Sequence, residues 1–597
     1  MSSVAMLSLW LLLGTSPPPT PTATPEALAV EAVDVAAEAA AASAAAVSDA
    51  PEVTGYRDAS GSTVSHSRGL LRVTVRRDAL RPTHGYWGAD VVLNNQGPRP
   101  LAVRLSFRPT AGEVPHTIER RVEVGAHQRV VTWLPLPIAW YSGELTIEAP
   151  GLDPIVEMII PDSDRAEPVL VLGTPKSFES AVDIQKSEDS ADSLFSARFI
   201  DDLGEAPRDL ALYAGFRAVV LAGEPSKVPA DVWAALDEYV VSGGRLVITR
   251  PARGLETYLP LWKAAPSATV PYGLGTVGSC AAQGFECQSL LRETLRRDPS
   301  DPVGLVNPVG IQPHMSMGSD MVPLLQSARA PLGRFLLLIS AFALLAGPGA
   351  WMLAKRRGPL AVLLAVPAVS AVTCLAIIAW SVLVDGFAVH TARYSLTYLD
   401  GARSRAATVG LGAWYANLSP EPLRLPASTV MLPPMESAGE LADMDWTNGL
   451  TVGSGFVPSR TYREWGEVSV VSSRTRLVVK REGDSLHVQN ALGAPLEEGF
   501  VRMGGKLWRV PALKEGEEGE GAPESEPEED NVAHALVGRA FEPGIQQRLW
   551  GAVQAFRADL GEGEFIARVG GPGPMPSSSM PAELNGAVHL IRGEVRP

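Results

Sequence analysis

Two long runs without a charged residue lie close together in this 597-residue chain, at residues 335–354 and 359–384. The first run reads FLLLISAFALLAGPGAWMLA, and as a helix its 20 residues span about 30 Å, the thickness of the hydrocarbon core of a bilayer. Only four residues separate the two runs. The sequence therefore predicts a two-helix transmembrane hairpin within residues 331–386, with the membrane lipid bilayer as one partner of the chain.

The turn between the two runs carries three basic residues, Lys355, Arg356 and Arg357. Positive residues in short loops favour the cytoplasmic side of a membrane. This turn is therefore expected inside the cell, and the large parts on both sides of the hairpin are expected outside the cell (inner) membrane. The bias is modest, because Arg329 and Arg334 precede the first run.

The amino terminus, residues 1–29, is expected to be a signal peptide. Residues 5–14 (AMLSLWLLLG) form a short apolar core, and Ala27 and Ala29 offer a small-x-small cleavage pattern. No Lys or Arg precedes the apolar core, and three prolines at 17–19 lie ahead of the cleavage pattern. A retained anchor and a misassigned start codon are therefore alternatives.

The composition places most of the chain in water. Hydrophobic residues make up 46% of the sequence, which suits soluble domains with a small membrane part better than a polytopic transporter. The formal net charge is −15, but nine acidic residues lie between Glu515 and Asp530. The remainder is mildly acidic and has no basic stripe, so no nucleic acid is expected as a partner.

The segment ahead of the hairpin changes character twice. Residues 30–66 are Ala-rich and poor in aromatic residues, which predicts a disordered linker. From residue 67, apolar and polar residues alternate, as at Val73 and Val75 or Val91 and Leu93, with turn residues between the runs. Residues 67–162 are therefore predicted to form a β-sandwich.

Residues 163–330 follow a different pattern. The continuous apolar runs 169–173 (VLVLG) and 217–223 (RAVVLAG) are typical of buried parallel strands. Residues 230–241 have Trp233, Leu236 and Val240 on one helical face and end at two glycines, after which 245–249 (RLVIT) reads as another strand. This order predicts a βαβ unit of a doubly wound α/β sheet.

The stretch YAGFRAVVLAGEPSKVPADVWAALDEYVVSGGRLVITRP resembles the class I glutamine amidotransferase-like domain of bacterial membrane proteins of unknown function. The order of the chain is similar to theirs too, with β-sandwich domains and a two-helix transmembrane hairpin beside that domain. The resemblance covers roughly residues 70–597 and rests on pattern and order. It implies an amidotransferase-like fold for residues 163–330.

Active members of that family are expected to carry a nucleophilic Cys after the strand that corresponds to residues 245–249. This sequence has Thr249 and Arg250 there, and its nearest cysteine is Cys280. Thiolate chemistry therefore has no residue to carry it, so no catalytic residue is assigned and enzyme activity is not expected.

Doubly wound sheets bind ligands at the carboxyl ends of their strands, where Glu224, Lys227 and Arg250 fall. These three residues are the ligand-binding candidates. The loop at residues 223–227 lacks a glycine-rich phosphate cradle, so ordinary surface charges are the alternative interpretation. The nine histidines include no H-x-H or H-E-x-x-H pair, and neither a metal nor another cofactor is expected.

The chain has three cysteines, too few for a disulfide scaffold or a Cys-rich zinc site. Cys280 and Cys287 form a C-x6-C pair, and in an oxidising extracytoplasmic compartment they are expected to form a disulfide. Two unrelated free thiols are the alternative. Cys374 lies inside the second apolar run and is expected to be free.

Residues 387–597 return to short alternating runs and are predicted to form a β-rich domain, with residues 514–531 as an acidic loop. The whole chain is thus predicted to be a multidomain α+β membrane protein. The leading functional hypothesis is a membrane-anchored extracytoplasmic binding or scaffold protein with protein partners. An accessory subunit of a membrane export system, and a hydrolase or transferase using carboxylates at the sheet edge, are the alternatives.

Overall fold

The computed structural model describes residues 55–296, 323–325, 332–383 and 388–596, with short internal gaps. The gaps are 78–79, 81, 83, 111–115, 141, 162–166, 188–192, 251–253, 264–267, 281–282, 433–441, 454 and 526–530. All described residues belong to one compact unit, Thr54–Pro597. The predicted signal peptide and most of the predicted linker lie outside the described residues.

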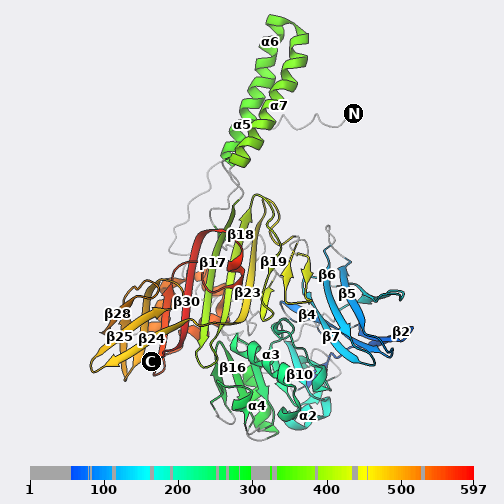
Figure 1. Cartoon of the computed structure of the whole chain (residues 1–597), viewed down its shortest axis with the longest axis vertical. Helices are drawn as coiled ribbons and strands as arrows, with labels where there is room; N and C mark the ends of the chain where they lie inside the picture. The colour runs from blue at the N-terminus through cyan, green and yellow to red at the C-terminus, as the bar shows by residue number, and fades with distance from the viewer. Residues whose placement is uncertain are drawn as a thin grey trace, which may run out of the picture. The chain divides into compact units, whose positions relative to one another are not determined.

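The described part of the chain is rich in β-strands, which form four sheets, and it has few helices (Figure 1). This coarse expectation from the sequence is confirmed. The sheets have eight, eleven, seven and four strands. Two of them combine strands that lie far apart in the sequence.

The eight-stranded sheet is mostly parallel, with the strand order β11-β1-β12-β10-β13-β14-β16-β15. Its strands are β1 (Gly55–Asp58), β10 (Glu167–Leu172), β11 (Gln185–Lys186), β12 (Ser193–Ile200), β13 (Ala218–Leu221), β14 (Arg245–Ile248), β15 (Thr269–Tyr272) and β16 (Gly275–Ser279). The helices of this α/β unit are α2 (Pro175–Val182), α3 (Ala230–Val241) and α4 (Phe285–Leu295). Within the described strands of this sheet, only β15 runs antiparallel to its neighbour.

Strand β1 lies within the segment predicted to be a disordered linker, so that prediction is wrong at its carboxyl end. Tyr56 explains why this short strand is ordered, because its ring is fully buried against Phe178, Phe195 and Phe199. Strand β2 (Thr63–Arg68) also begins before residue 67. Residues 55–58 and 63–66 therefore lie in strands, and one strand of the α/β sheet comes from ahead of the sandwich.

The sandwich consists of a four-stranded sheet, β2-β3-β4-β7, and a seven-stranded sheet, β19-β22-β21-β6-β5-β8-β9. Further bounds are β3 (Leu71–Arg76), β4 (Tyr86–Asn95), β5 (Leu101–Pro109), β6 (Ile118–Val124), β7 (Arg129–Pro137), β8 (Gly143–Glu148) and β9 (Ile155–Ile159). The remaining three strands come from beyond residue 387: β19 (Leu423–Arg424), β21 (Met444–Asp445) and β22 (Thr451–Val452). The predicted division into a sandwich and a separate carboxyl-terminal domain is therefore wrong, because one sheet contains strands from both segments.

The eleven-stranded sheet has the order β20-β23-β18-β17-β30-β29-β26-β27-β28-β25-β24. Its strands are β17 (Val389–Asp400), β18 (Arg405–Ala416), β20 (Thr429–Leu432), β23 (Tyr462–Ser472), β24 (Arg476–Glu482), β25 (Ser485–Ala491), β26 (Leu496–Met503), β27 (Lys506–Val510), β28 (Glu518–Glu524), β29 (Glu564–Val569) and β30 (Glu583–Glu594). Helices α8 (Val532–Ala540), α9 (Pro543–Arg548) and α10 (Trp550–Arg557) accompany it.

The acidic segment is not simply a loop, because β28 lies within it and pairs with both β25 and β27. Its sequence, EGEGAPE, alternates charged and small residues. Gly519 lies close to Leu513 and Gly521 close to Leu486, while Glu518 and Glu520 are exposed. The glycines let the strand approach a core that a larger side chain would block, and the glutamates remain in water.

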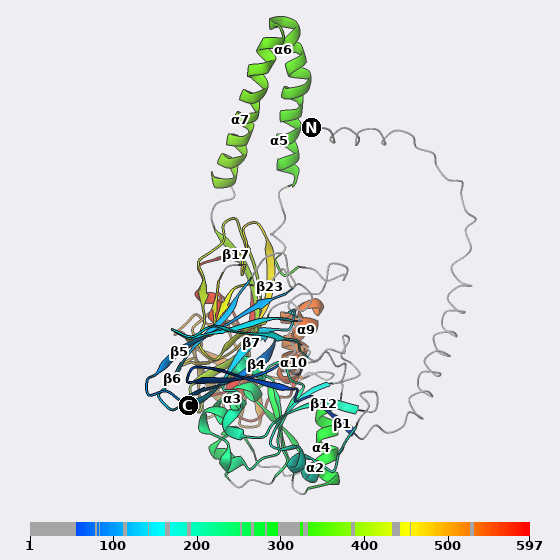
Figure 2. The ribbon, with the colours of Figure 1, turned by 90° about the vertical axis from the view of Figure 1, so that its right-hand side faces the viewer.

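The two apolar runs form helices. The first comprises α5 (Leu332–Leu344), a π-helical turn at Leu345–Gly349 that contains Pro348, and α6 (Ala350–Arg357). The second is α7 (Pro359–Leu383), which lies beside α5 and α6 (Figure 2). Proline lacks an N–H and clashes with the preceding turn, which accounts for the π-helical interruption.

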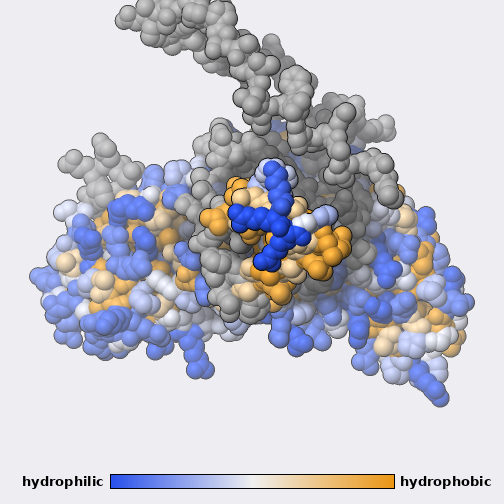
Figure 3. All heavy atoms as spheres, turned by 90° about the horizontal axis from the view of Figure 1, so that it is seen from above, coloured by the Kyte–Doolittle hydropathy of each residue, from blue (hydrophilic) through white to orange (hydrophobic). Residues whose placement is uncertain are grey.

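Within the described residues, one helical stretch, Pro359–Ala379, is long and apolar enough to cross a membrane, with a mean hydropathy of 2.5. Lys355, Arg356 and Arg357 lie in the last turn of α6 and are exposed, so only Gly358, with φ 84°, separates the two helices. Seen from above, hydrophobic atoms surround the hydrophilic atoms of this turn (Figure 3).

Candidate functional site

The predicted site at the carboxyl edge of the parallel sheet is an exposed ion pair. Nζ of Lys227 lies 2.9 Å from Oε2 of Glu224, and the two side chains are 70% and 48% exposed. The hydrogen bond from Lys227 and its charge hold the pKa of Glu224 below its usual value. Arg250 follows β14, but within the described residues no hydrogen bond joins it to either partner. The three candidates therefore do not converge on an enclosed pocket.

Thr249 occupies the position where the resemblance implies a nucleophilic cysteine. Its side chain is fully buried, and its Oγ1 donates a hydrogen bond to the carbonyl oxygen of Leu221 at 3.2 Å. A hydroxyl that is buried and turned onto the neighbouring strand is not available to a substrate. The structure thus provides no nucleophile at this position.

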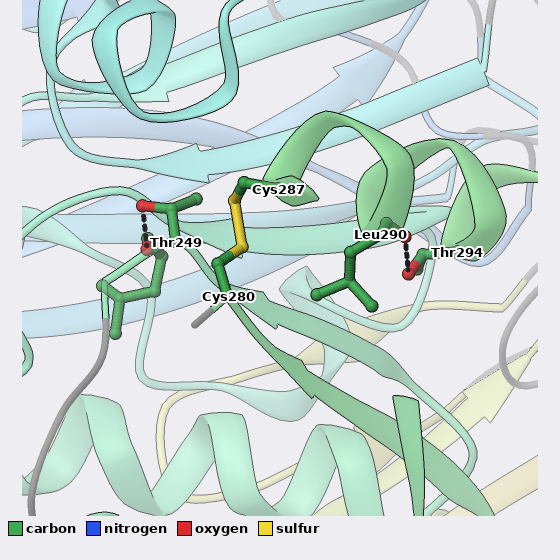
Figure 4. The surroundings of a disulfide bond; sticks show 6 residues. Thr249, Cys280, Cys287, Leu290 and Thr294 are labelled. Carbon is green, nitrogen blue, oxygen red and sulfur yellow. Dashed lines mark hydrogen bonds between the residues drawn. A yellow bond between two sulfur atoms is a disulfide. The ribbon is translucent and has the colours of Figure 1, made fainter. Parts of the chain in front are cut away.

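Cys280 and Cys287 are joined by a disulfide whose Cα atoms are 5.2 Å apart (Figure 4). Cys280 follows β16, and Cys287 lies in the first turn of α4, so the bond fastens that helix to the strand beside β14. Both residues are buried in the core below the sheet edge. Cys374 on α7 is free.

A second group of chemically active side chains lies in the eleven-stranded sheet, and no sequence pattern predicted it. Glu467 of β23 pairs in register with Gly410 of β18, Gly410 with Ser395 of β17, and Ser395 with His589 of β30. These residues form one row across four strands. Oγ of Ser395 lies 2.8 Å from Nδ1 of His589.

The row is covered by the connection between β29 and β30, which contains the short 3-10 helix η8 (Pro576–Ser579). The backbone N–H of Ser577 faces both carboxylate oxygens of Glu467 at 3.3 Å, and the carbonyl oxygen of Ser577 accepts a hydrogen bond from Arg393 at 3.4 Å. Met575 lies over Gly410. We call Pro576–Ser579 and its neighbours Gly571–Met575 the strap.

Burial sets the protonation of this polar row. It raises the pKa of Glu467 to about 7, against the hydrogen bonds from Ser577 and the positive charge of Arg393. Burial also lowers the pKa of His589 to about 4, and Arg393 acts in the same direction. Each residue therefore favours its neutral form. Glu467, Ser395, Ser577 and His589 are all 0% exposed, so in this conformation the row fixes the strap and reaches no solvent.

A third polar group joins the α/β unit to the strands that follow α7. Asp237 of α3 accepts hydrogen bonds from Arg403, Arg405 and the hydroxyl of Tyr272, and its side chain is 3% exposed. Arg405 also binds Asp400 at 2.8 Å. Asp400 ends β17 and Arg405 begins β18, so the turn of this hairpin is fastened to α3.

Open depressions of the described surface are shallow. Two of them, with volumes of about 320 and 230 Å3, are both lined by Arg509 and Glu498. Arg509 and Arg539 both pair with Glu498, at 3.6 and 2.9 Å. No group of three or more metal-ligating side chains occurs among the described residues.

Comparisons with known proteins leave the family open. No family model and no curated protein matches the chain. A cycloisomaltooligosaccharide glucanotransferase from Paenibacillus sp., crystallised with cycloisomaltoheptaose, is similar over 29% of this chain and 27% of its own, with 13% identity and a TM-score of 0.14. An exo-chitosanase from Amycolatopsis orientalis is similar over 77% of this chain and 76% of its own, with 10% identity and a TM-score of 0.10. Scores this low carry no argument about fold or function.

Proposed function

We propose that the protein is a membrane-anchored, extracytoplasmic binding or scaffold protein. In this proposal the helices within residues 331–386 anchor the chain as a transmembrane hairpin. The α/β unit keeps an amidotransferase-like fold but has lost its catalysis. Its partners are the lipid bilayer and other proteins.

The observation that carries the proposal is a sheet that combines strands from both sides of the helices. Met444 of β21 pairs with Ile118 of β6, and Asp237 of α3 binds Arg403 and Arg405. Segments that touch in this way must lie on the same side of a membrane. The chain between them must then cross an even number of times, which supports a hairpin over a single crossing.

The surface of α7 gives independent support for a membrane. None of the stretch Pro359–Ala379 is buried by the rest of the described chain, although it is strongly apolar. A helix that is hydrophobic and uncovered needs an apolar surrounding, and a bilayer supplies one. The exposed basic turn at Lys355–Arg357 supports a cytoplasmic tip, and the Cys280–Cys287 disulfide suits an oxidising compartment for the remainder.

The lack of a nucleophile supports a binding role over catalysis. Thr249 is buried and Cys280 is in a disulfide, so neither can attack a substrate carbonyl. Glu224, the only carboxylate among the sheet-edge candidates, forms an exposed ion pair with Lys227, which weakens the alternative of a carboxylate-based hydrolase or transferase.

An accessory subunit of an export system is the second candidate, and one observation favours it. A Cβ atom placed on Gly347 would meet no atom within 4 Å, so there is open space beside this glycine of the π-helical turn. Small residues allow close approach of another membrane helix. Purification of the solubilised full chain with its stoichiometric partners would separate this candidate from a solitary scaffold.

Topology is the direct test of the leading proposal. A reporter active only in the cytoplasm is inserted at Gly358, and in a second chain it follows Pro597. We expect activity at Gly358 alone. Activity at the carboxyl terminus and none at Gly358 would overturn the proposal.

Catalysis is tested separately. The purified full chain is expected to release no ammonia from glutamine above background. Robust release by the unchanged protein would refute the loss of catalysis.

A further inference from the structure

Residues Pro323–Leu325 are bound on one face of the eleven-stranded sheet, away from the polar row. Leu324 and Leu325 are 7% and 3% exposed, so both side chains belong to the core. Leu325 precedes the first residue of α5, Leu332, by only seven positions. The segment bound on the sheet therefore precedes the first apolar helix by only a few residues in the sequence.

Side chains, and not the ladder of the sheet, hold the backbone of this segment. The N–H of Leu324 donates to Oε1 of Glu464 at 3.1 Å, and its carbonyl oxygen accepts from the hydroxyl of Tyr394 at 3.5 Å. The N–H of Leu325 donates to the hydroxyl oxygen of Tyr462 at 3.5 Å. Within the described residues, no backbone hydrogen bond joins Pro323–Leu325 to a strand.

The carboxylate that receives the Leu324 N–H is buried and paired. Oε2 of Glu464 lies 2.7 Å from a guanidinium nitrogen of Arg548 on α9, and the two side chains are 1% and 4% exposed. The hydroxyl of Tyr462 donates to Oε1 of the same carboxylate. Burial of a charged pair is costly unless every remaining lone pair is satisfied, and here the peptide N–H satisfies one of them.

Two small residues lie beside Glu464 on the same face of the sheet. Glu464 pairs in register with Ala413 of β18, and Ala413 with Ala392 of β17, the strand that also carries Tyr394. Both alanines are buried in the same core as Leu324. The side chains of Tyr394, Tyr462 and Glu464, which hold the peptide backbone, therefore share one face of the sheet with two small side chains, in the core that also buries both leucines.

We propose that Tyr394, Tyr462, Glu464 and Arg548 form a binding site for an extended peptide with two consecutive leucines, of which Pro323–Leu325 is the resident, releasable occupant. We call these four residues the leucine socket. The inference goes beyond the proposed function and does not depend on membrane topology. A partner that presents such a segment therefore competes with Pro323–Leu325 for the leucine socket.

The free energy gained by burying two leucine side chains is of the same order as the entropy cost of ordering three residues, so the segment can be released at a small net cost. The tether favours the resident segment, since a covalently linked ligand has an effective concentration in the millimolar range. A free peptide should therefore bind weakly to the unchanged protein and more tightly once the resident leucines are removed.

Occupancy is tested by thiol labelling of the solubilised full chain, in a Cys374→Ser background. Leu325→Cys should react with a maleimide at least tenfold more slowly than Leu418→Cys, whose position is 54% exposed. Adding Leu324→Asp to Leu325→Cys should raise its rate at least tenfold. Equal rates for Leu325→Cys and Leu418→Cys, or no effect of Leu324→Asp, would overturn the proposal.

Recognition is tested with a fluorescein-labelled peptide, Gly-Gly-Pro-Leu-Leu-Gly amide, and a control peptide in which both leucines are aspartates. The variant Leu324→Asp/Leu325→Asp should bind the leucine peptide at least tenfold more tightly than the unchanged chain, and should not bind the control. Equal binding by both proteins, or none by the variant at 1 mM peptide, contradicts the socket.

A milder variant guards against misfolding of the doubly substituted chain. Tyr394→Phe removes one hydroxyl and leaves the ring in place. It should raise the labelling rate of Leu325→Cys severalfold with an unchanged circular dichroism spectrum. An unchanged rate would show that the Tyr394 hydroxyl does not hold the segment and would count against the proposal.

Discussion

Glu467 and His589 lie on one face of the eleven-stranded sheet at positions linked in register through Gly410 and Ser395. Burial drives their pKa values in opposite directions, to about 7 for Glu467 and about 4 for His589. Both shifts favour a neutral side chain. Their effects on the pH dependence of stability are therefore opposite in sign.

Between about pH 4.5 and 6.5, the effects of Glu467 and His589 on the free energy of unfolding should oppose each other. Over that range Glu467 keeps a proton in the folded chain and loses it in the unfolded chain. Its contribution to the free energy of unfolding therefore falls as pH rises. His589 binds a proton in the unfolded chain but not in the folded chain, so its contribution to the free energy of unfolding rises with pH. Plotted against pH, each contribution changes by up to about 1.4 kcal/mol per pH unit.

Single variants should reveal each slope. Relative to the unchanged protein, Glu467→Gln should become more stable as pH rises from 4.5 to 6.5, and His589→Gln should become less stable. Urea unfolding of the solubilised full chain at three pH values measures both. Profiles parallel to that of the unchanged protein would show that the polar row does not titrate in this way.

The strap offers a matched pair of glycines. Gly571 and Gly573 both have positive φ angles, 78° and 74°, but a Cβ on Gly573 would lie 2.2 Å from the His589 ring, whereas one on Gly571 would meet nothing within 4 Å. Gly571→Ala should cost about 1–2 kcal/mol, from the backbone alone. Gly573→Ala should cost about 1–3 kcal/mol more, because it overpacks the site. Equal unfolding midpoints would contradict this close contact.

Asp237 should be a stability determinant that links the α/β unit to the β17–β18 turn. Asp237→Asn keeps the shape but removes the charge that faces Arg403 and Arg405. We expect a loss of about 2–4 kcal/mol, below the full cost of breaking a buried pair because Arg403 is 30% exposed.

Asp231 on the same helix supplies the control. It pairs with Arg208, and the side chains are 54% and 41% exposed. Asp231→Asn should cost less than about 1 kcal/mol. Similar losses for the two variants, measured by urea unfolding, would argue that Asp237 has no special role.

The Cys280–Cys287 disulfide should be local in effect. Its short loop predicts a stabilisation of about 2.5 kcal/mol on the chain-entropy model, so Cys280→Ser/Cys287→Ser should lose no more than that. Mass spectrometry after alkylation without reduction provides the direct measurement. Full labelling of both cysteines in the unchanged protein would show that they are reduced.

Local patterns predicted the elements that bury one continuous apolar surface. The strand 217–223, the helix 230–241 and the strand 245–249 agree with β13, α3 and β14 within a few residues. Their apolar runs and the two glycines after the helix are local properties of the sequence. The pairing of β6 with β21 could not be predicted in this way, because it joins residues 118 and 444 and leaves no periodic signal in either segment.

The polar row was missed for a related reason. In β17, polar residues at Thr391, Arg393, Ser395 and Thr397 alternate with apolar ones, which normally indicates a solvent-exposed face. The structure buries that face beneath the strap, a connection whose position depends on contacts with Glu467 and Arg393. The ligand candidates at the sheet edge were chosen from fold topology, and topology alone does not bring their side chains together.

The pairing of β6 with β21 also determines when the seven-stranded sheet can be completed during synthesis. Synthesis runs from the amino terminus, and residues 442–453 are made only after α5, α6 and α7. Until then, one edge of the strand at residues 118–124 stays unpaired. An unpaired strand edge is a template for association with other chains. The nascent protein therefore passes through a period of vulnerability to aggregation, and a chain truncated after the helices would remain in it permanently.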